Sequence, residues 1–131
     1  MTRGPPPEKA IALALPIAQA RGFAVFCKRE RGSVCDIVIF NNAVTIVVRL
    51  ARTKCINQSV ADMEAQFAGA ATCLGRIPAA DRRSREIWAC DYYNNLRFFQ
   101  VNGTGFVEIG RDGKPVGNND RPGDPGKKGV I

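Results

Sequence analysis

The chain has 131 residues, a formal net charge of +7 and 45% hydrophobic residues. This length and composition predict one globular domain with a single core. The longest apolar run near the start, residues 10–18, is far shorter than the roughly 20 residues of a membrane span. The sequence contains no histidine, which argues against a zinc site and a histidine-dependent catalytic triad. The basic charge favours a polyanionic partner such as nucleic acid.

The cysteines predict a reducing compartment rather than a disulfide framework. They are odd in number and spread along the chain without a Cys-x-x-Cys spacing: Cys27, Cys35, Cys55, Cys73 and Cys90. Free thiols packed as small apolar residues are typical of a cytoplasmic protein. Residues 3–20 also imitate a secretory signal, but Glu8 and Pro16 fit a signal poorly, and the same stretch makes a reasonable first helix.

The first half of the chain predicts a helix followed by three strands. The helix begins at Glu8 and ends at Arg21, with Gly22 as its C-cap. A short apolar strand covers residues 23–28, and a charged connection leads from it into the next strand at residue 34.

The centre of the predicted sheet is a hairpin in residues 34–54. Two runs of β-branched and aliphatic residues flank an Asn-Asn pair, which is typical of a two-residue turn. In this register Asp36 faces Val47, and Arg49 lies diagonal to Asp36 on the same face. The opposite face is wholly apolar and should be core. A lone carboxylate is costly in such a hairpin, so an ion pair between Asp36 and Arg49 is expected.

The second half of the chain predicts a helix and three more strands. Asn57 or Ser59 caps the helix, which ends at Gly75. The apolar stripe of this helix consists of Val60, Met63, Phe67, Ala70, Ala71 and Leu74. Residues 79–85 are a loop, residues 86–93 and 96–101 form a second hairpin around another Asn-Asn pair, and residues 106–109 are a last strand. Five aromatic residues are expected in the core or in cross-strand pairs, with base stacking or a protein interface as the alternative: Trp88, Tyr92, Tyr93, Phe98 and Phe99.

The element order is helix, three strands, helix, three strands. It predicts an α/β domain in residues 1–109 with a mixed central sheet flanked by two helices, because the second helix can cross over one face of the sheet. The glycine, proline and charge content of residues 110–131 predicts a flexible basic tail.

Three motifs add a family resemblance to this element order. They are Gly-Phe-Ala-Val at residues 22–25, Asp-Ile-Val at residues 36–38 and Thr-Ile-Val-Val-Arg-Leu-Ala-Arg-Thr-Lys at residues 45–54. With the element order, they resemble the restriction-endonuclease-like superfamily of PD-(D/E)xK nucleases, and within it the archaeal Holliday-junction resolvases. The resemblance implies an αβββαβ core and a domain of a kind that commonly forms dimers.

The resemblance also implies a metal site from which this chain departs. In such nucleases an aspartate on the second strand and a Glu (or Asp)-x-Lys triplet on the third hold a divalent metal. Asp36 occupies the aspartate position, but Arg49 stands at the metal-binding acid and Ala51 at the lysine. Cys35 replaces the motif's proline, and Glu8 matches a first-helix glutamate on spacing alone. A divalent cation needs a cluster of oxygen ligands, so Asp36, Arg49 and Ala51 are expected to be vestiges without metal or catalysis.

The favoured hypothesis is a catalytically inactive nuclease-like domain that binds DNA through a basic surface. The expected phosphate contacts lie in loops and at strand ends: Lys28, Arg29, Arg31, Arg52, Lys54, Arg82, Arg83 and Arg85. No cofactor and no membrane partner are expected.

Two alternatives are open at this point. An active endonuclease or resolvase would need Mg²⁺, a ligand from the second helix such as Asp62, Glu64 or Gln66, and Arg52 or Lys54 in place of the lysine. A protein-interaction module would form a homodimer, with the last strand as its pairing edge.

Overall fold

The computed structural model describes residues 8–27, 33–103 and 105–116, and the side chains from residue 9 onward within them. The elements follow the predicted order. They are α1 (Glu8–Arg21), β1 (Phe23–Phe26), β2 (Ile37–Phe40), β3 (Thr45–Arg52), α2 (Val60–Gln66), α3 (Ala68–Leu74), β4 (Arg83–Cys90), β5 (Leu96–Asn102) and β6 (Gly105–Ile109).

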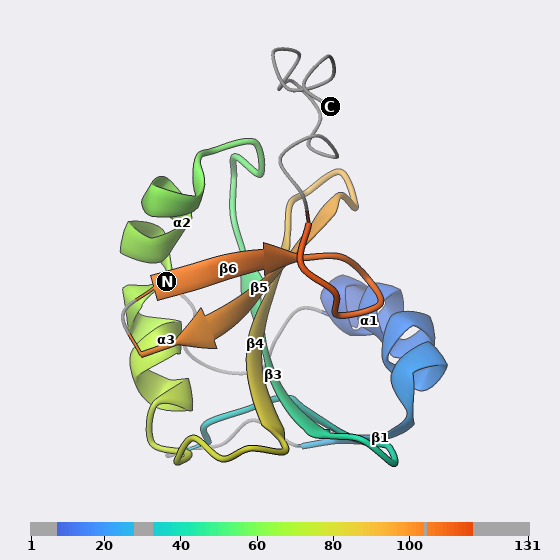
Figure 1. The fold of residues 1–131 in the computed structure, drawn as a ribbon. Coiled ribbons are helices and arrows are strands. Elements are labelled where there is room, and N and C mark those ends of the chain that lie inside the picture. The colour runs from blue at the N-terminus through green and yellow to red at the C-terminus, as the bar shows by residue number, and fades with distance from the viewer. Residues whose placement is uncertain (1–7, 28–32, 104, 117–131) are drawn as a thin grey trace, which may run out of the picture.

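The strands form one six-stranded sheet in the order β1-β2-β3-β4-β5-β6, with β3 and β4 at its centre (Figure 1). Neighbouring strands are antiparallel except β3 and β4, which are parallel. Parallel neighbours need a crossover connection, and α2 and α3 supply it. The predicted α/β class with a mixed sheet is therefore confirmed.

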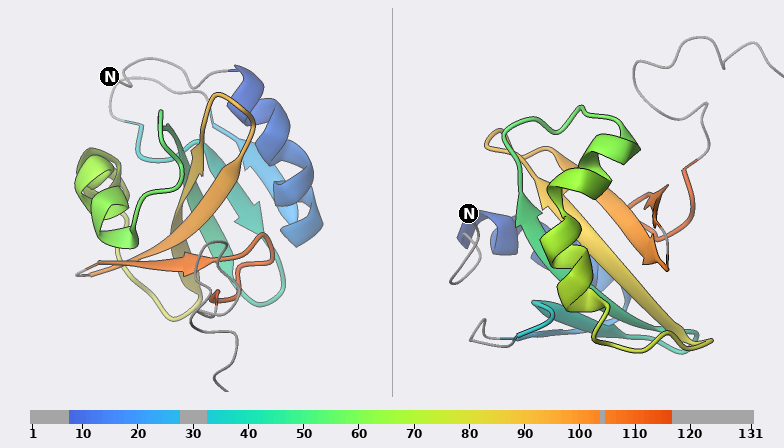
Figure 2. Two further views of the ribbon diagram at one scale, coloured as in Figure 1. Left: turned by 90° about the horizontal axis from the view of Figure 1, so that it is seen from above. Right: turned by 90° about the vertical axis from the view of Figure 1, so that its left-hand side faces the viewer.

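Helices cover both faces of the sheet and bury two cores (Figure 2). The core beneath α1 contains the apolar face that the sequence predicts for the hairpin, including Ile37, Ile46 and Val48. The core beneath α2 and α3 contains Met63 and Phe99, among others. At the end of α1, a Cβ on Gly22 would overlap the carbonyl oxygen of Phe40, so the chain can enter β1 this closely only with glycine at that position.

The hairpin of β2 and β3 differs from the predicted register by two residues. Its loop covers four residues, 41–44, because the side-chain oxygen of Asn41 accepts hydrogen bonds from two backbone N–H groups within the loop, each at 2.8 Å. Phe40 consequently pairs with Thr45 instead of Ala43. A shift of two residues keeps the paired residues of both strands on their predicted faces, which is why the predicted core survives the wrong register. Cys35, which precedes β2, is the exception, because it packs against the opposite core.

The predicted second helix is two short helices, so the sheet is flanked by three helices instead of two. Ser59 is the N-cap, as expected, and its hydroxyl accepts the backbone N–H of Asp62 at 3.1 Å. The helical dihedrals are interrupted at Phe67 (φ −103°, ψ 24°). The predicted apolar stripe nevertheless continues across the interruption and packs on the sheet.

The hairpin of β4 and β5 contains the second Asn-Asn pair, but the predicted two-residue turn is wrong, because Cys90 pairs with Leu96 and the loop covers five residues, 91–95. Asn94 has a positive φ of 69°, a conformation that asparagine adopts more readily than most residues. Trp88 and its neighbours in the strands are buried as predicted, but Tyr92 and Tyr93 lie exposed in the loop instead of in the core.

After β6, residues 110–116 fold back toward the sheet. The backbone N–H of Val116 donates to the Glu108 carbonyl at 3.0 Å, and Pro115 forms a bridge with Ile109. Residues 117–131 of the segment predicted as a tail lie outside the described residues. Within the described part of the chain, no helix has the length and apolar character needed to span a membrane.

Candidate functional site

Asp36 lies immediately before β2, and the four-residue loop brings it level with Arg49 on β3. The Asp36 side chain is almost fully buried, and its Oδ2 accepts the backbone N–H of Leu50 at 2.8 Å. Asp36 Oδ1 lies 3.9 Å from Arg49 Nη1. The carboxylate thus takes the place of a strand carbonyl in the β2–β3 ladder and pairs with the guanidinium that the sequence predicts.

The neighbouring positions of the resembled metal site also hold no acid. Arg49 Nη1 additionally donates to the Ser33 carbonyl at 3.4 Å. Ala51 is buried among the apolar residues beneath α2 and α3, and Cys35 packs against the same core. Burial raises the pKa of the Cys35 thiol to about 12, with further contributions from Cys27 and Asp36, so this thiol is neutral at physiological pH.

Of the residues on the second helix that were considered as metal ligands, Glu64 and Gln66 make other contacts, and Asp62 is exposed on α2. Glu64 Oε2 accepts the backbone N–H of Phe106 at 2.7 Å and thereby ties α2 to β6. Gln66 bonds to the Thr53 hydroxyl, with Nε2 at 2.9 Å from Oγ1. Glu8 is the first residue of α1, and its side chain lies outside the described part. Among the described residues, no group of three or more His, Cys, Asp or Glu side chains is placed to hold a metal ion.

Basic side chains gather where β3 ends. Arg52 is the last residue of β3, Lys54 follows it with an exposed side chain, and Lys9 is exposed on the first turn of α1. Burial and the nearby Asp91 raise the pKa of the Cys90 thiol, whereas Arg52 and Lys9 lower it, which places both cations near the same strand end. The predicted Lys28, Arg29 and Arg31 lie outside the described residues.

The remaining predicted arginines lie at the opposite end of the central strands. Arg83 pairs with Thr45 and Cys90 pairs with Arg52, so the two ends of this ladder are about 23 Å apart at the rise of ~3.3 Å per strand residue. Arg83 and Arg85 belong to β4, not to a loop as predicted. Their guanidinium groups donate to the Pro78 and Ile77 carbonyls that follow α3, at 2.6 and 3.2 Å. The structure thus divides the predicted basic surface into two.

Tyr92 and Tyr93 join the basic residues at the end of β3. The Arg52 guanidinium lies over the ring of Tyr92, 4.4 Å from the ring centre, in a cation–π contact. Arg52, Lys54 and Tyr92 line a cavity of about 470 Å³ with Thr53 and Gln66. The sequence predicts a strand that extends to residue 93, so both tyrosines were expected in the core or in cross-strand pairs, with base stacking only as the alternative; in the structure β4 ends at Cys90 and both rings are exposed.

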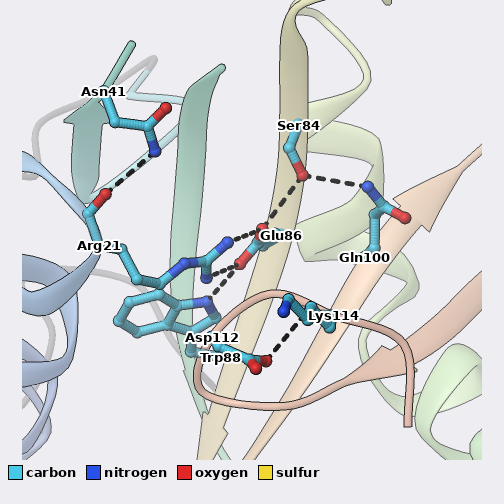
Figure 3. A network of polar contacts seen from close by, with 8 residues as sticks. All are labelled: Arg21, Asn41, Ser84, Glu86, Trp88, Gln100, Asp112 and Lys114. Carbon is cyan, nitrogen blue, oxygen red and sulfur yellow. Dashed lines mark hydrogen bonds and ion pairs between the residues drawn. The ribbon is translucent and has the colours of Figure 1, made fainter. Parts of the chain in front are cut away.

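A second polar centre lies on the other face of the sheet, where sequence reasoning predicted no site. Glu86 on β4 is 1% exposed and forms a bidentate ion pair with Arg21 of α1, at 2.8 and 2.9 Å (Figure 3). Ser84 Oγ and Trp88 Nε1 also donate to this carboxylate, at 3.1 and 2.9 Å. Gln100 Nε2 donates in turn to Ser84 Oγ at 3.2 Å. The centre borders a cavity of about 840 Å³ whose walls include apolar residues of α1.

Comparisons with known proteins find a distant structural likeness and no match by sequence. No family model matches the chain, and no curated protein matches it. Among solved structures, the chain is similar to Hjc of Archaeoglobus fulgidus, a Holliday junction resolvase from an archaeal hyperthermophile, at 17% identity and a TM-score of 0.40. The match covers 76% of this chain and 85% of that chain. A likeness at this level carries no residue correspondence, so the functional proposal rests on the geometry described above.

Proposed function

We propose that this chain is a nuclease-like domain that binds DNA at the C-terminal end of β3 and does not cleave it. The observation that carries the proposal is the Asp36–Arg49 pair. The Arg49 guanidinium lies 3.9 Å from the Asp36 carboxylate, and Ala51 stands at the position of the lysine in the nuclease motif. A fixed positive charge at that position opposes a bound divalent cation and therefore metal-dependent cleavage.

The surroundings of the pair support a role in binding. Arg52, Lys54 and Lys9 present positive charge at the same strand end. Cys27 and Ser33 lie beside the pair, because Cys27 N–H donates to the Asp36 carbonyl and the Ser33 carbonyl accepts from Arg49. Clustered cations of this kind bind phosphates with little sequence preference.

The test measures duplex binding as a function of salt for two charge-matched variants. Lys9→Ala/Lys54→Ala removes two exposed cations at the end of β3, and Arg76→Ala/Arg82→Ala removes two exposed cations near the start of β4. We expect the first variant to bind more weakly and to lower the slope of log affinity against log salt by about 0.9 for each lost phosphate contact. The second variant should behave as wild type. Equal effects of the two variants would indicate only a net-charge effect.

Cleavage is assayed in the same experiment with Mg²⁺ or Mn²⁺ present. We expect retention without cleavage. Metal-dependent cleavage that disappears in Asp36→Ala would overturn the inactive assignment, because contaminating nucleases do not depend on Asp36.

A self-association module is the second candidate, and the exposed edge of β1 favours it. Phe23 pairs with Phe40 across the β1–β2 ladder, and the two rings are 71% and 48% exposed. Both rings lie on the face of the sheet on which α2 and α3 pack. These helices do not extend over β1 and β2 (Figure 2). The β6 edge considered from the sequence is partly occupied, since Val116 N–H donates to Glu108 there.

A further inference from the structure

Two neighbouring tyrosines are displayed at the tip of the β4–β5 hairpin. Tyr92 is 50% exposed and Tyr93 is 82% exposed, although the adjoining strands bury their aromatic residues. Large aromatic rings are usually at least partly buried, and these two neighbouring rings contribute little to the packing of the core. Their position next to Arg52 and Lys54 places them at the end of the sheet to which the proposed DNA-binding surface belongs.

The loop that carries the tyrosines is held in a defined shape. Asp91 Oδ1 accepts the backbone N–H groups of Tyr93 and Asn95, at 2.8 and 2.9 Å, and Asp91 Oδ2 accepts the Asn95 side-chain amide at 3.0 Å. These hydrogen bonds, led by the one from the Asn95 side chain, lower the pKa of the Asp91 carboxyl. The loop is therefore preorganised, and a ligand that meets the rings need not order the chain first.

The cavity beside Tyr92 combines an aromatic wall with cationic and amide groups. The Arg52 guanidinium lies over the Tyr92 ring at 4.4 Å, and Lys54, Gln58 and Gln66 also line the cavity. Its volume of about 470 Å³ falls within the range of roughly 300–1,000 Å³ that is usual for small-ligand sites. A flat ring, two cations and amide groups match the base and the phosphate of a nucleotide.

We infer that Tyr92 and Tyr93 form a stacking platform for unpaired bases of single-stranded DNA, with Arg52 and Lys54 as the cations that meet the backbone. The inference rests on the proposed DNA binding and deepens it by naming the form of the DNA. Bases inside a duplex are stacked on both faces, whereas a single strand can offer each base to an aromatic side chain.

The experiment compares labelled oligo-dT with a duplex of the same length by fluorescence polarisation. The variants are Tyr92→Ala/Tyr93→Ala and Tyr92→Phe/Tyr93→Phe. Removing both rings should weaken oligo-dT binding about 5- to 100-fold, the equivalent of one stacked base or slightly more, and leave duplex binding within about twofold. The phenylalanine variant should bind oligo-dT as wild type does, because it keeps both rings and loses only the hydroxyl groups.

The outcomes separate this inference from the proposed function. Duplex binding without oligo-dT binding in the wild type would leave the proposed function intact and overturn the platform. Unchanged oligo-dT binding in the alanine variant, or an equal loss in the phenylalanine variant, would also overturn it. If the wild type binds neither DNA, the proposed function itself is wrong. The fluorescence of buried Trp88 checks that each variant is folded.

Discussion

At the scale of single residues, Asp36 joins two interactions that substitutions can separate. Its Oδ2 accepts the Leu50 N–H inside the sheet, and its Oδ1 faces Arg49. Asp36→Ala removes both, and we expect it to lower the free energy of unfolding by about 3 kcal/mol. Asp36→Asn keeps an acceptor for Leu50 and loses only the charge, so it should cost about 1–2 kcal/mol. Urea unfolding followed by Trp88 fluorescence measures both.

Arg49→Met is the matched control for these two variants. It leaves the buried Asp36 carboxylate bonded to Leu50 but without its cation, so it should cost more than Asp36→Asn, about 3 kcal/mol. Equal losses for Asp36→Ala and Asp36→Asn would show that the hydrogen bond to Leu50 adds nothing beyond the ion pair.

At the scale of elements, the Arg21–Glu86 pair fastens α1 to β4, and the two sides of the pair are unequally buried. The Arg21 side chain is 10% exposed and that of Glu86 only 1%. Arg21→Met leaves the buried Glu86 carboxylate without its cation and should lower the free energy of unfolding by about 3–5 kcal/mol. Glu86→Gln keeps the shape of the side chain and leaves the Arg21 guanidinium, which is nearer to solvent, unpaired. It should therefore cost about half as much.

Unfolding of the double variant Arg21→Met/Glu86→Gln completes a double-mutant cycle. Glu86→Gln removes the carboxylate charge that Arg21→Met leaves unpaired. The double variant should therefore be more stable than the sum of the two single losses predicts. Additive losses would show that the two side chains contribute independently and that the ion pair does not fasten α1.

The same two elements show what the sequence can and cannot predict. Apolar periodicity located the strands, the capped second helix and the face of the hairpin that is buried, because these depend on neighbours along the chain. The Arg21–Glu86 pair joins residues 65 positions apart, and nothing local marks Glu86 as buried. The hairpin register was wrong because the Asn41 side chain stabilises a longer loop than the backbone preference of asparagine alone suggests.

The candidate site was predictable to a similar extent. The Asp36–Arg49 pair could be predicted from alternation, which places both on one face of a hairpin whichever of the two registers holds. The division of the basic residues could not, because it follows from the parallel pairing of β3 with β4, in which Arg83 meets Thr45. Parallel register is set by the length of the crossover and its packing, which the sequence states only indirectly.

At the scale of the whole molecule, the two candidate functions occupy opposite ends of the sheet and respond to salt in opposite directions. The exposed Phe23 and Phe40 lie near the start of β3, since Phe40 pairs with Thr45. A second copy could pair with the outer edge of β1, along which no other strand of the described residues lies, in an isologous contact that also covers these rings. The net charge of +7 opposes such association, and salt screens that repulsion.

We therefore expect an average mass that rises with protein concentration, and rises further at high salt, in sedimentation equilibrium. Phe23→Ser/Phe40→Ser should keep the mass of one chain under all conditions and retain DNA binding. Tyr93→Ser is the matched control, because it removes an exposed ring at the far end of the sheet and should associate as wild type does. A wild-type mass that stays at one chain would show that the β1 edge is not a self-association surface. Association that weakens as salt rises would instead indicate an ionic interface, because apolar contacts are not screened by salt, whereas attraction between charges is.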